Sequence, residues 1–217
     1  MPIGDSMGDT FLSLRRCFLE PPQEILTAAR LLREAVDAHL VGQKHRAEAL
    51  ISAADVPAIA KWTDSVWGRR NQQIHRFRPV PSCPPTLPIE MRPQPRMPTE
   101  DTLLRVKQRD GFHCRFCGIP VIDSPVRRRI RAAYPGVLRW GRKNVDQHAA
   151  FQCMWLQYDH VLPNSREGES SLDNIVVTCA PCNFGRMEWT LEHVGLLDPR
   201  ITPVSPSVSW NGLEDFV

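Results

Sequence analysis

Two Cys-x-x-Cys pairs flank a set of polar residues that are able to bind metals and move protons. A gap of two residues lets both sulfurs of a pair reach one tetrahedral ion, and four thiolates around one ion form a common closed zinc site. A single pair also occurs in redox motifs, but two pairs favour a metal. The sequence therefore predicts a structural zinc site whose ligands are Cys114, Cys117, Cys179 and Cys182.

The polar residues between and beside these pairs fit the hydrolysis of a phosphodiester. That reaction needs an activated water, a cation on the phosphate and help for the leaving oxygen. His160 is the expected general base, since a neutral imidazole accepts a proton near pH 7. Asp159 and Asn183 offer hard oxygen donors, which suit one Mg²⁺ or Mn²⁺ ion that keeps several waters. Because adjacent side chains of a regular strand face opposite sides, we expect the Asp-His step where a strand bends or ends, close to Pro163.

Local patterns predict a strand, a loop, a second strand and a helix around these residues. Residues 155–162 form the first predicted strand, and the β-branched residues 175–178 form the second. The polar stretch between them contains Gly168 and several serines, which indicates a loop. A helix is expected from Asn183 to about Trp189.

This ββα arrangement resembles the HNH endonucleases of the ββα-metal type. The segment RDGFHCRFCG, residues 109–118, is similar to the start of the zinc-bearing subgroup, and the resemblance covers about residues 99–190. It implies an α+β fold with a ββα-metal core stapled by the four-cysteine zinc site. The small helical N-terminal region that precedes this core lies outside the resemblance and is predicted from its apolar pattern. The family motif corresponds here to Asp159, His160, Asn174 and Asn183.

The resemblance also implies functions for individual residues. Asn174 resembles the central asparagine, whose amide ties the loop and positions the histidine strand. Arg186 stands where the family often has lysine, and arginine can hold a phosphate through two parallel hydrogen bonds. The implied activity is divalent-metal-dependent cleavage of DNA, with 5′-phosphate and 3′-hydroxyl products. An alternative of another class is a catalytically inactive, zinc-stapled module that binds nucleic acid or serves as an adaptor.

A basic insert between the first cysteine pair and the Asp-His step is a candidate DNA-binding segment. Residues 118–158 are longer than a minimal HNH unit requires, and no acidic residue lies between Asp123 and Asp146. Such a block is typical of a surface that binds a phosphate backbone, although a solvated face or loop gives the same pattern. Its candidate substrate-binding residues are Arg127, Arg128, Arg129 and Arg131.

The sequence of the remaining residues predicts a helical region, a linker and an irregular tail. Apolar residues recur at steps of three and four from Glu24, which predicts a helix that Gly42 stops. Further helices are expected at 44–53 and after Pro57, and this region is a candidate docking site for a protein partner. Eight of the twenty residues from 79 to 98 are prolines, which indicates an extended linker. The predicted parts are residues 1–78 (helical region), 79–98 (linker), 99–197 (HNH domain) and 198–217 (irregular tail).

Composition limits the protein class only weakly. The net charge of +3 decides little, and the seven cysteines are odd in number. Cys17, Cys83 and Cys153 have no close partner in sequence and are expected to be apolar filler or exposed thiols. No apolar run reaches the roughly 18 residues of a membrane span, and no secretory signal is visible at the N-terminus. We therefore expect no membrane association and a cytoplasmic location.

Overall fold

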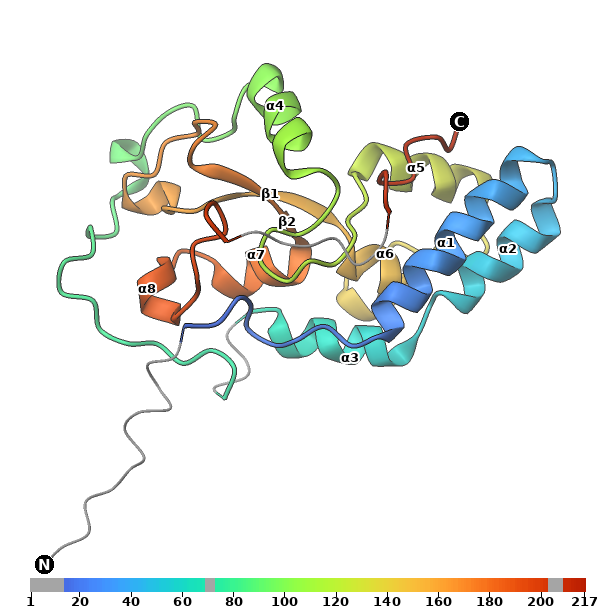
Figure 1. Cartoon of the computed structure of the whole chain (residues 1–217), viewed down its shortest axis with the longest axis horizontal. Helices are drawn as coiled ribbons and strands as arrows, with labels where there is room; N and C mark the ends of the chain where they lie inside the picture. Colours follow the sequence, from blue (N-terminus) through green and yellow to red (C-terminus); the bar gives the residue numbers. More distant parts are fainter. Residues whose placement is uncertain (1–13, 69–72, 203–208) are drawn as a thin grey trace, which may run out of the picture.

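The structure, a computed structural model, describes residues 14–68, 73–202 and 209–217. A two-stranded sheet lies between two helices, with further helices at one end (Figure 1). The strands are β1 (Leu156–His160) and β2 (Ile175–Cys179). The helices flanking the sheet are α4 (Glu100–Asp110) and α7 (Ala180–Arg186). The other helices are α1 (Glu24–Leu40), α2 (Lys44–Ala53), α3 (Pro57–Val66), α5 (Ser124–Ala133), α6 (Ala149–Cys153) and α8 (Leu191–Val194).

The first three helices follow the predicted pattern closely. The apolar stripe of α1 is buried, and the helix ends at Leu40, just before Gly42 adopts a left-handed φ of 77°. This conformation is costly for residues with a side chain, so glycine suits the turn into α2. The second helix has the predicted bounds, and α3 begins with Pro57, whose missing N–H costs nothing in a first turn.

The ββα unit is present, with boundaries that differ from those predicted. The strands β1 and β2 are antiparallel, and His160 pairs with Ile175. β1 is shorter than the predicted 155–162 and ends at His160, which places the Asp-His step at a strand end as expected. The prediction of a helix from Asn183 to Trp189 was wrong by three residues at each end. Pro181 is accommodated in the first turn of α7, and the chain turns away at Met187, where φ is 55°.

A side-chain cap begins the helix α4. Thr99 Oγ1 accepts a hydrogen bond from the backbone N–H of Thr102 at 3.2 Å. Gly111, with a φ of 67°, ends the helix and turns the chain toward the first cysteine pair. This helix therefore sets the direction in which Cys114 and Cys117 approach β2.

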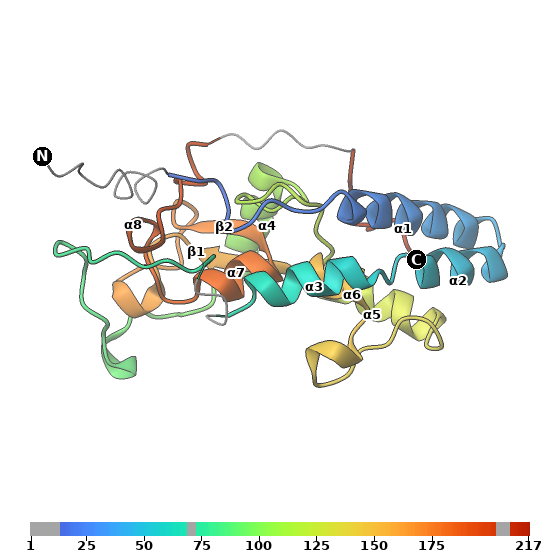
Figure 2. The same ribbon diagram turned by 90° about the horizontal axis from the view of Figure 1, so that it is seen from below.

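The N-terminal helices pack on the ββα unit. One buried hydrophobic cluster contains residues of both, including Leu32, Ile59 and Val177. Figure 2 shows α3 alongside α6 and α7. A glycine permits this contact, because a Cβ atom on Gly185 of α7 would lie 2.6 Å from the carbonyl oxygen of Val66. The division of the chain into a helical region and an HNH domain remains a prediction.

The proline-rich segment 79–98 runs along the loop between the two strands. Leu87 N–H donates to Ser165 O at 2.7 Å, and Asn164 Nδ2 donates to Pro93 O at 2.9 Å. The segment has a turn closed by Cys83 N–H to Val80 O at 3.0 Å and a 3₁₀ turn at Ile89–Met91. It is therefore attached to the ββα unit by hydrogen bonds, which brings its side chains close to β1.

The C-terminal residues return to the body of the protein. Trp210 Nε1 donates to Val121 O at 2.8 Å, and the ring of Phe216 stacks on His39 of α1 at 4.3 Å. Pro203 and Pro206 of the predicted irregular tail, like Arg69 and Arg70 after α3, lie outside the described residues. None of the helices in the described ranges is long and apolar enough to cross a membrane.

Candidate active site

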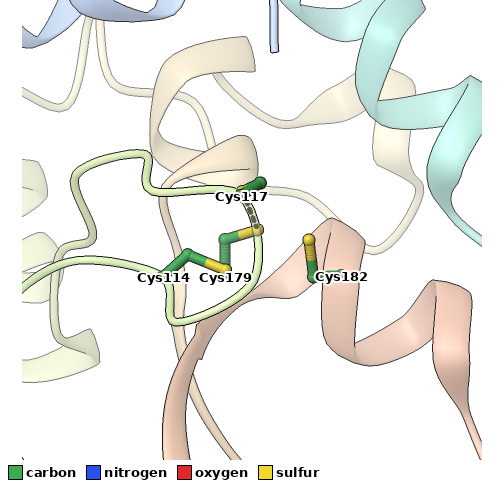
Figure 3. A group of neighbouring side chains, drawn as sticks. All are labelled: Cys114, Cys117, Cys179 and Cys182. Carbon is green, nitrogen blue, oxygen red and sulfur yellow. Dashed lines mark hydrogen bonds between the residues drawn. The ribbon is translucent and has the colours of Figure 1, made fainter. Parts of the chain in front are cut away.

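The four predicted zinc ligands converge from two parts of the chain. Cys114 and Cys117 lie on the loop after α4, Cys179 ends β2, and Cys182 lies in the first turn of α7 (Figure 3). Their sulfur atoms all lie within 4.8 Å of one another, and the Sγ atoms of Cys117 and Cys179 are 3.6 Å apart. Sulfurs around a tetrahedral zinc ion, with Zn–S bonds of about 2.3 Å, are about 3.8 Å apart. The predicted cluster is confirmed, and its geometry is compatible with zinc.

The other three cysteines lie outside this cluster. Cys17 and Cys153 are buried, Cys83 is half-buried, and all three are free thiols. Burial raises the pKa of the Cys153 thiol, so it stays protonated and packs as a small apolar group.

Asp159, His160 and Asn183 line one cavity of about 350 Å³. The first two residues come from the end of β1 and the third from α7, so antiparallel pairing and the return of the helix bring them together. Asn183 Nδ2 lies 3.5 Å from Gln157 Oε1, at the limit of a hydrogen bond. The structure thus places three of the predicted site residues around a common space.

The same cavity is lined by two arginines for which the sequence predicts no role. Arg92 and Arg96 belong to the proline-rich segment and reach the cavity because that segment follows the loop between the strands. Two basic residues among prolines are a weak signal, and only the contacts of the segment show where they lie. The cavity is also lined by Met97, Tyr158, Pro163, Asn164, Ser165, Phe184, Met187 and Glu188.

Hydrogen bonds define the protonation of His160. Ser170 Oγ donates to Arg96 O at 2.7 Å, which uses its only proton. The contact of 3.0 Å between Ser170 Oγ and His160 Nε2 therefore requires Nε2–H as the donor. A neutral His160 then has its free lone pair on Nδ1, the atom able to accept a proton.

The environment of His160 keeps the ring neutral. Burial lowers the pKa of its imidazole to about 4, and the positive charges of Arg186 and Arg96 act in the same direction. The ring is thus uncharged at pH 7, as general base chemistry requires.

Asp159 is buried and paired with Arg186. Burial raises the pKa of the Asp159 carboxyl, while the charge and hydrogen bonds of Arg186 oppose this shift. The guanidinium donates to both carboxylate oxygens and also to the backbone carbonyls of His160, Val161 and Trp189. All five of its N–H donors are engaged within the chain, so a phosphate contact would require Arg186 to give up one of these bonds.

Asn174 joins the two ends of the loop between the strands. Its Oδ1 accepts from Leu162 N–H at 2.8 Å, and its Nδ2 donates to Leu162 O at 3.0 Å and to Glu169 O at 2.9 Å. Gly168 passes so close to this junction that a Cβ atom there would lie 1.7 Å from Leu162 O. The loop beside His160 is therefore closely constrained.

The four arginines of the basic insert lie on α5 and do not line the cavity beside His160. Arg127 is buried, whereas Arg128, Arg129 and Arg131 are exposed. Arg129 Nε donates to Phe216 O at 3.0 Å, which fixes it toward the C-terminal residues. Any contact that these residues make with a ligand would lie outside the cavity beside His160.

Comparison with known families agrees with this site. The family model of the HNH endonucleases matches residues 141–186, a range that contains β1, the loop, β2 and α7. The resemblance to HNH endonucleases is thus confirmed for this segment, which includes Asp159, His160, Asn174 and Asn183. No curated protein and no solved structure matches the chain.

Proposed function

We propose that the protein is an HNH-type, divalent-metal-dependent endonuclease that hydrolyses phosphodiester bonds in DNA. The observation that carries this proposal is the common cavity lined by Asp159, His160 and Asn183 within the segment that the HNH model matches. In this proposal, His160 Nδ1 accepts the proton of the attacking water, and Asn174 holds the loop that positions the histidine.

The residues at the cavity fit a divalent ion. A carboxylate has about four lone-pair sites, of which Arg186 occupies two, so Asp159 retains sites for a cation. Asn183 supplies an amide oxygen from the facing helix. Two protein oxygens are enough for Mg²⁺ or Mn²⁺, which usually keep waters and bind substrate phosphate. Such an ion supplies positive charge to the phosphate and the leaving 3′ oxygen.

Arg92 and Arg96 are proposed as the phosphate-binding residues of this cavity. Both line it, and guanidinium groups bind phosphate oxygens in a fixed fork geometry. In this proposal they make the phosphate contact that the sequence suggested for Arg186. Arg186 instead supports the proposed function by orienting Asp159.

Zinc is proposed at the four cysteines as a purely structural ion. Four thiolates leave no open position for water, so the site holds the fold and takes no part in hydrolysis. The ion would fix the loop after α4 to the start of α7, and so would set the distance between Asn183 and β1.

The test is cleavage of supercoiled plasmid DNA with Mg²⁺, Mn²⁺ or added Zn²⁺. We expect nicked or linear products with Mg²⁺ or Mn²⁺, and a loss of at least a hundredfold in the His160→Ala variant. The exposed His45 provides the matched control His45→Ala, which should cut like the wild type. Circular dichroism and zinc content establish that both variants are folded.

The alternative, an inactive module that binds nucleic acid, predicts a different result. The wild type would then retard DNA in a gel without cutting it under any of these metal conditions. Equal cutting by the wild type and His160→Ala would place the activity at another centre and would overturn the proposed role of His160.

A further inference from the structure

Four aromatic rings form a continuous row across the surface of the protein. Trp67 stacks on Phe184 with 4.5 Å between ring centroids, Phe184 lies 6.2 Å from Trp155, and Trp155 lies 5.7 Å from Trp140. All four rings are only partly buried. They come from four separate segments, so the row is a product of the tertiary structure. A contiguous group of partly exposed aromatic rings is a candidate interaction surface.

One part of the row lies at the candidate active site. Phe184 follows Asn183 on α7 and lines the same cavity as His160. Trp155 immediately precedes β1, and its Nε1 donates to Ser124 Oγ at 2.8 Å, which attaches the row to the first turn of α5. The row therefore connects the cavity with the basic helix.

The other end of the row carries a group of arginines. The guanidinium carbon of Arg127 lies 3.5 Å from the centroid of the Trp140 ring and 5.1 Å from that of Trp155. Arg127 is only 8% exposed, and its Nη1 has no hydrogen-bond partner within the described part of the chain. The same part of the chain offers no carboxylate in an ion pair with it. Asp123 acts on this charge without forming an ion pair, while Arg128 and Arg131 add further positive charge. The resulting excess of positive charge favours an anionic ligand.

Two further arginines strengthen that field and are accessible. Arg128 and Arg131 are exposed on α5, and Arg131 lies one turn after Arg127 on the same side of the helix. Burial, followed by the charges of Arg128 and Arg131, lowers the pKa of Arg127 to about 10. Both side chains are exposed and can reach phosphates, and Trp140 and Trp155 are each only partly buried.

We propose that this row and the arginines of α5 bind a single-stranded segment of DNA that leads into the cavity at His160. Every base has an aromatic face, so bases stack on protein rings with little dependence on sequence, while basic residues follow the backbone. A duplex keeps its base faces covered by neighbouring pairs, so it gains little from a row of rings. The direction of the strand, toward the cavity at His160, rests on the proposed function. The inference adds that unpaired DNA is the preferred substrate.

The first test measures binding without cleavage. The His160→Ala protein, which retains the whole row, is titrated into fluorescein-labelled oligothymidine or a duplex of the same length, and anisotropy is recorded without added Mg²⁺ or Mn²⁺. We expect binding of the single strand to be at least tenfold tighter than binding of the duplex. Equal affinity, or tighter binding of the duplex, overturns the proposal.

The second test compares variants within the row. Trp140→Ala should weaken binding of the single strand roughly tenfold, as expected for the loss of one stacked base, and Trp140→Phe should restore most of it. Arg128→Ala with Arg131→Ala should lower the slope of log K against log salt by roughly 1.4, the value for two phosphates of a single strand. Arg105→Ala, an exposed arginine on α4, is the matched control and should leave both quantities unchanged.

The outcomes separate this inference from the nuclease proposal. If the wild type binds single strands preferentially but cuts no DNA, the proposed binding role of the row is supported and the proposed nuclease activity is refuted. If cutting depends on His160 and the Trp140→Ala variant binds single strands as tightly as the wild type, the nuclease proposal is supported and the binding role of the row is refuted.

Discussion

The guanidinium of Arg186 and the carboxylate of Asp159 form a buried, two-pronged ion pair where the end of β1 meets α7. Nε lies 2.9 Å from one carboxylate oxygen and Nη2 lies 2.5 Å from the other. The side chains are 1% and 7% exposed, respectively. Since the same guanidinium also binds three backbone carbonyls, the pair fixes the proposed metal ligand and the strand end that carries His160.

Removing Arg186 should destabilise the protein strongly. Arg186→Met leaves a buried carboxylate without a partner, which typically costs about 3–5 kcal/mol. We expect a decrease of this size in the free energy of unfolding measured with urea. The control Arg105→Met removes an exposed pair at 4.0 Å and should cost less than about 1 kcal/mol.

The Arg186→Met effect should also depend on pH. Arg186 opposes the rise in the pKa of Asp159 that burial causes, so its removal raises that pKa further. The cost of the unpaired carboxylate exists only while the group is ionised. The difference between wild type and variant should therefore shrink as pH falls below the raised pKa, and a constant difference would contradict this account.

Loss of one cysteine from the cluster should remove the metal and the fold together. Purified wild type should contain one zinc ion per chain, since four sulfur atoms surround a single position. Cys182→Ser should lose the ion and its folding energy, which is on the order of 10 kcal/mol for such sites. Elemental analysis and circular dichroism measure both effects. Cys83→Ser, outside the cluster, should keep its zinc, and an unchanged metal content in Cys182→Ser would refute the site.

Asn174→Ala should loosen the loop beside His160. The substitution removes three hydrogen bonds and leaves Leu162 N–H without its acceptor, which should cost about 1–3 kcal/mol. Amide hydrogen exchange should become faster at Leu162, while exchange at Val177, in the middle of β2, should follow only the global change in stability. Unchanged protection of Leu162 would show that Asn174 does not hold the loop.

His148 should make the stability of the protein fall in mild acid. The ring is fully buried between α2 and α6, and its Nε2–H donates to Ile51 O at 2.8 Å. Burial lowers its pKa to about 4, below the ordinary value of 6.5. Because the unfolded chain then binds a proton more readily than the folded one, stability is full above about pH 6.5 and is lost as pH falls toward 4.

The size of this effect can be measured by urea unfolding across that range. The pKa shift of His148 corresponds to a loss on the order of 3 kcal/mol. His148→Gln, which can still donate to Ile51 O, should be less sensitive to pH over the same interval. An identical pH dependence in the variant would assign the effect to other groups.

Short-range features of the sequence anticipated much of the local structure. The apolar stripe in α1 and the glycine after it act within a few residues, so their consequences can be read from spacing. The strand β1 ends earlier than predicted. Its pairing with β2 stops at the pair of His160 and Ile175, and such pairing depends on a partner distant in the chain.

The sequence by itself determined the four-cysteine cluster and the HNH motif, because cysteine spacing and the order of strand, loop, strand and helix are properties of the chain as written. Only the tertiary structure decided which charge meets which partner. Arg186 pairs with the carboxylate of Asp159, 27 positions earlier in the chain, and the proline-rich segment places Arg92 and Arg96 at the cavity. Four rings from separate segments form one row. Such contacts depend on how separate elements pack together, and that packing is set by the whole buried core rather than by any one segment.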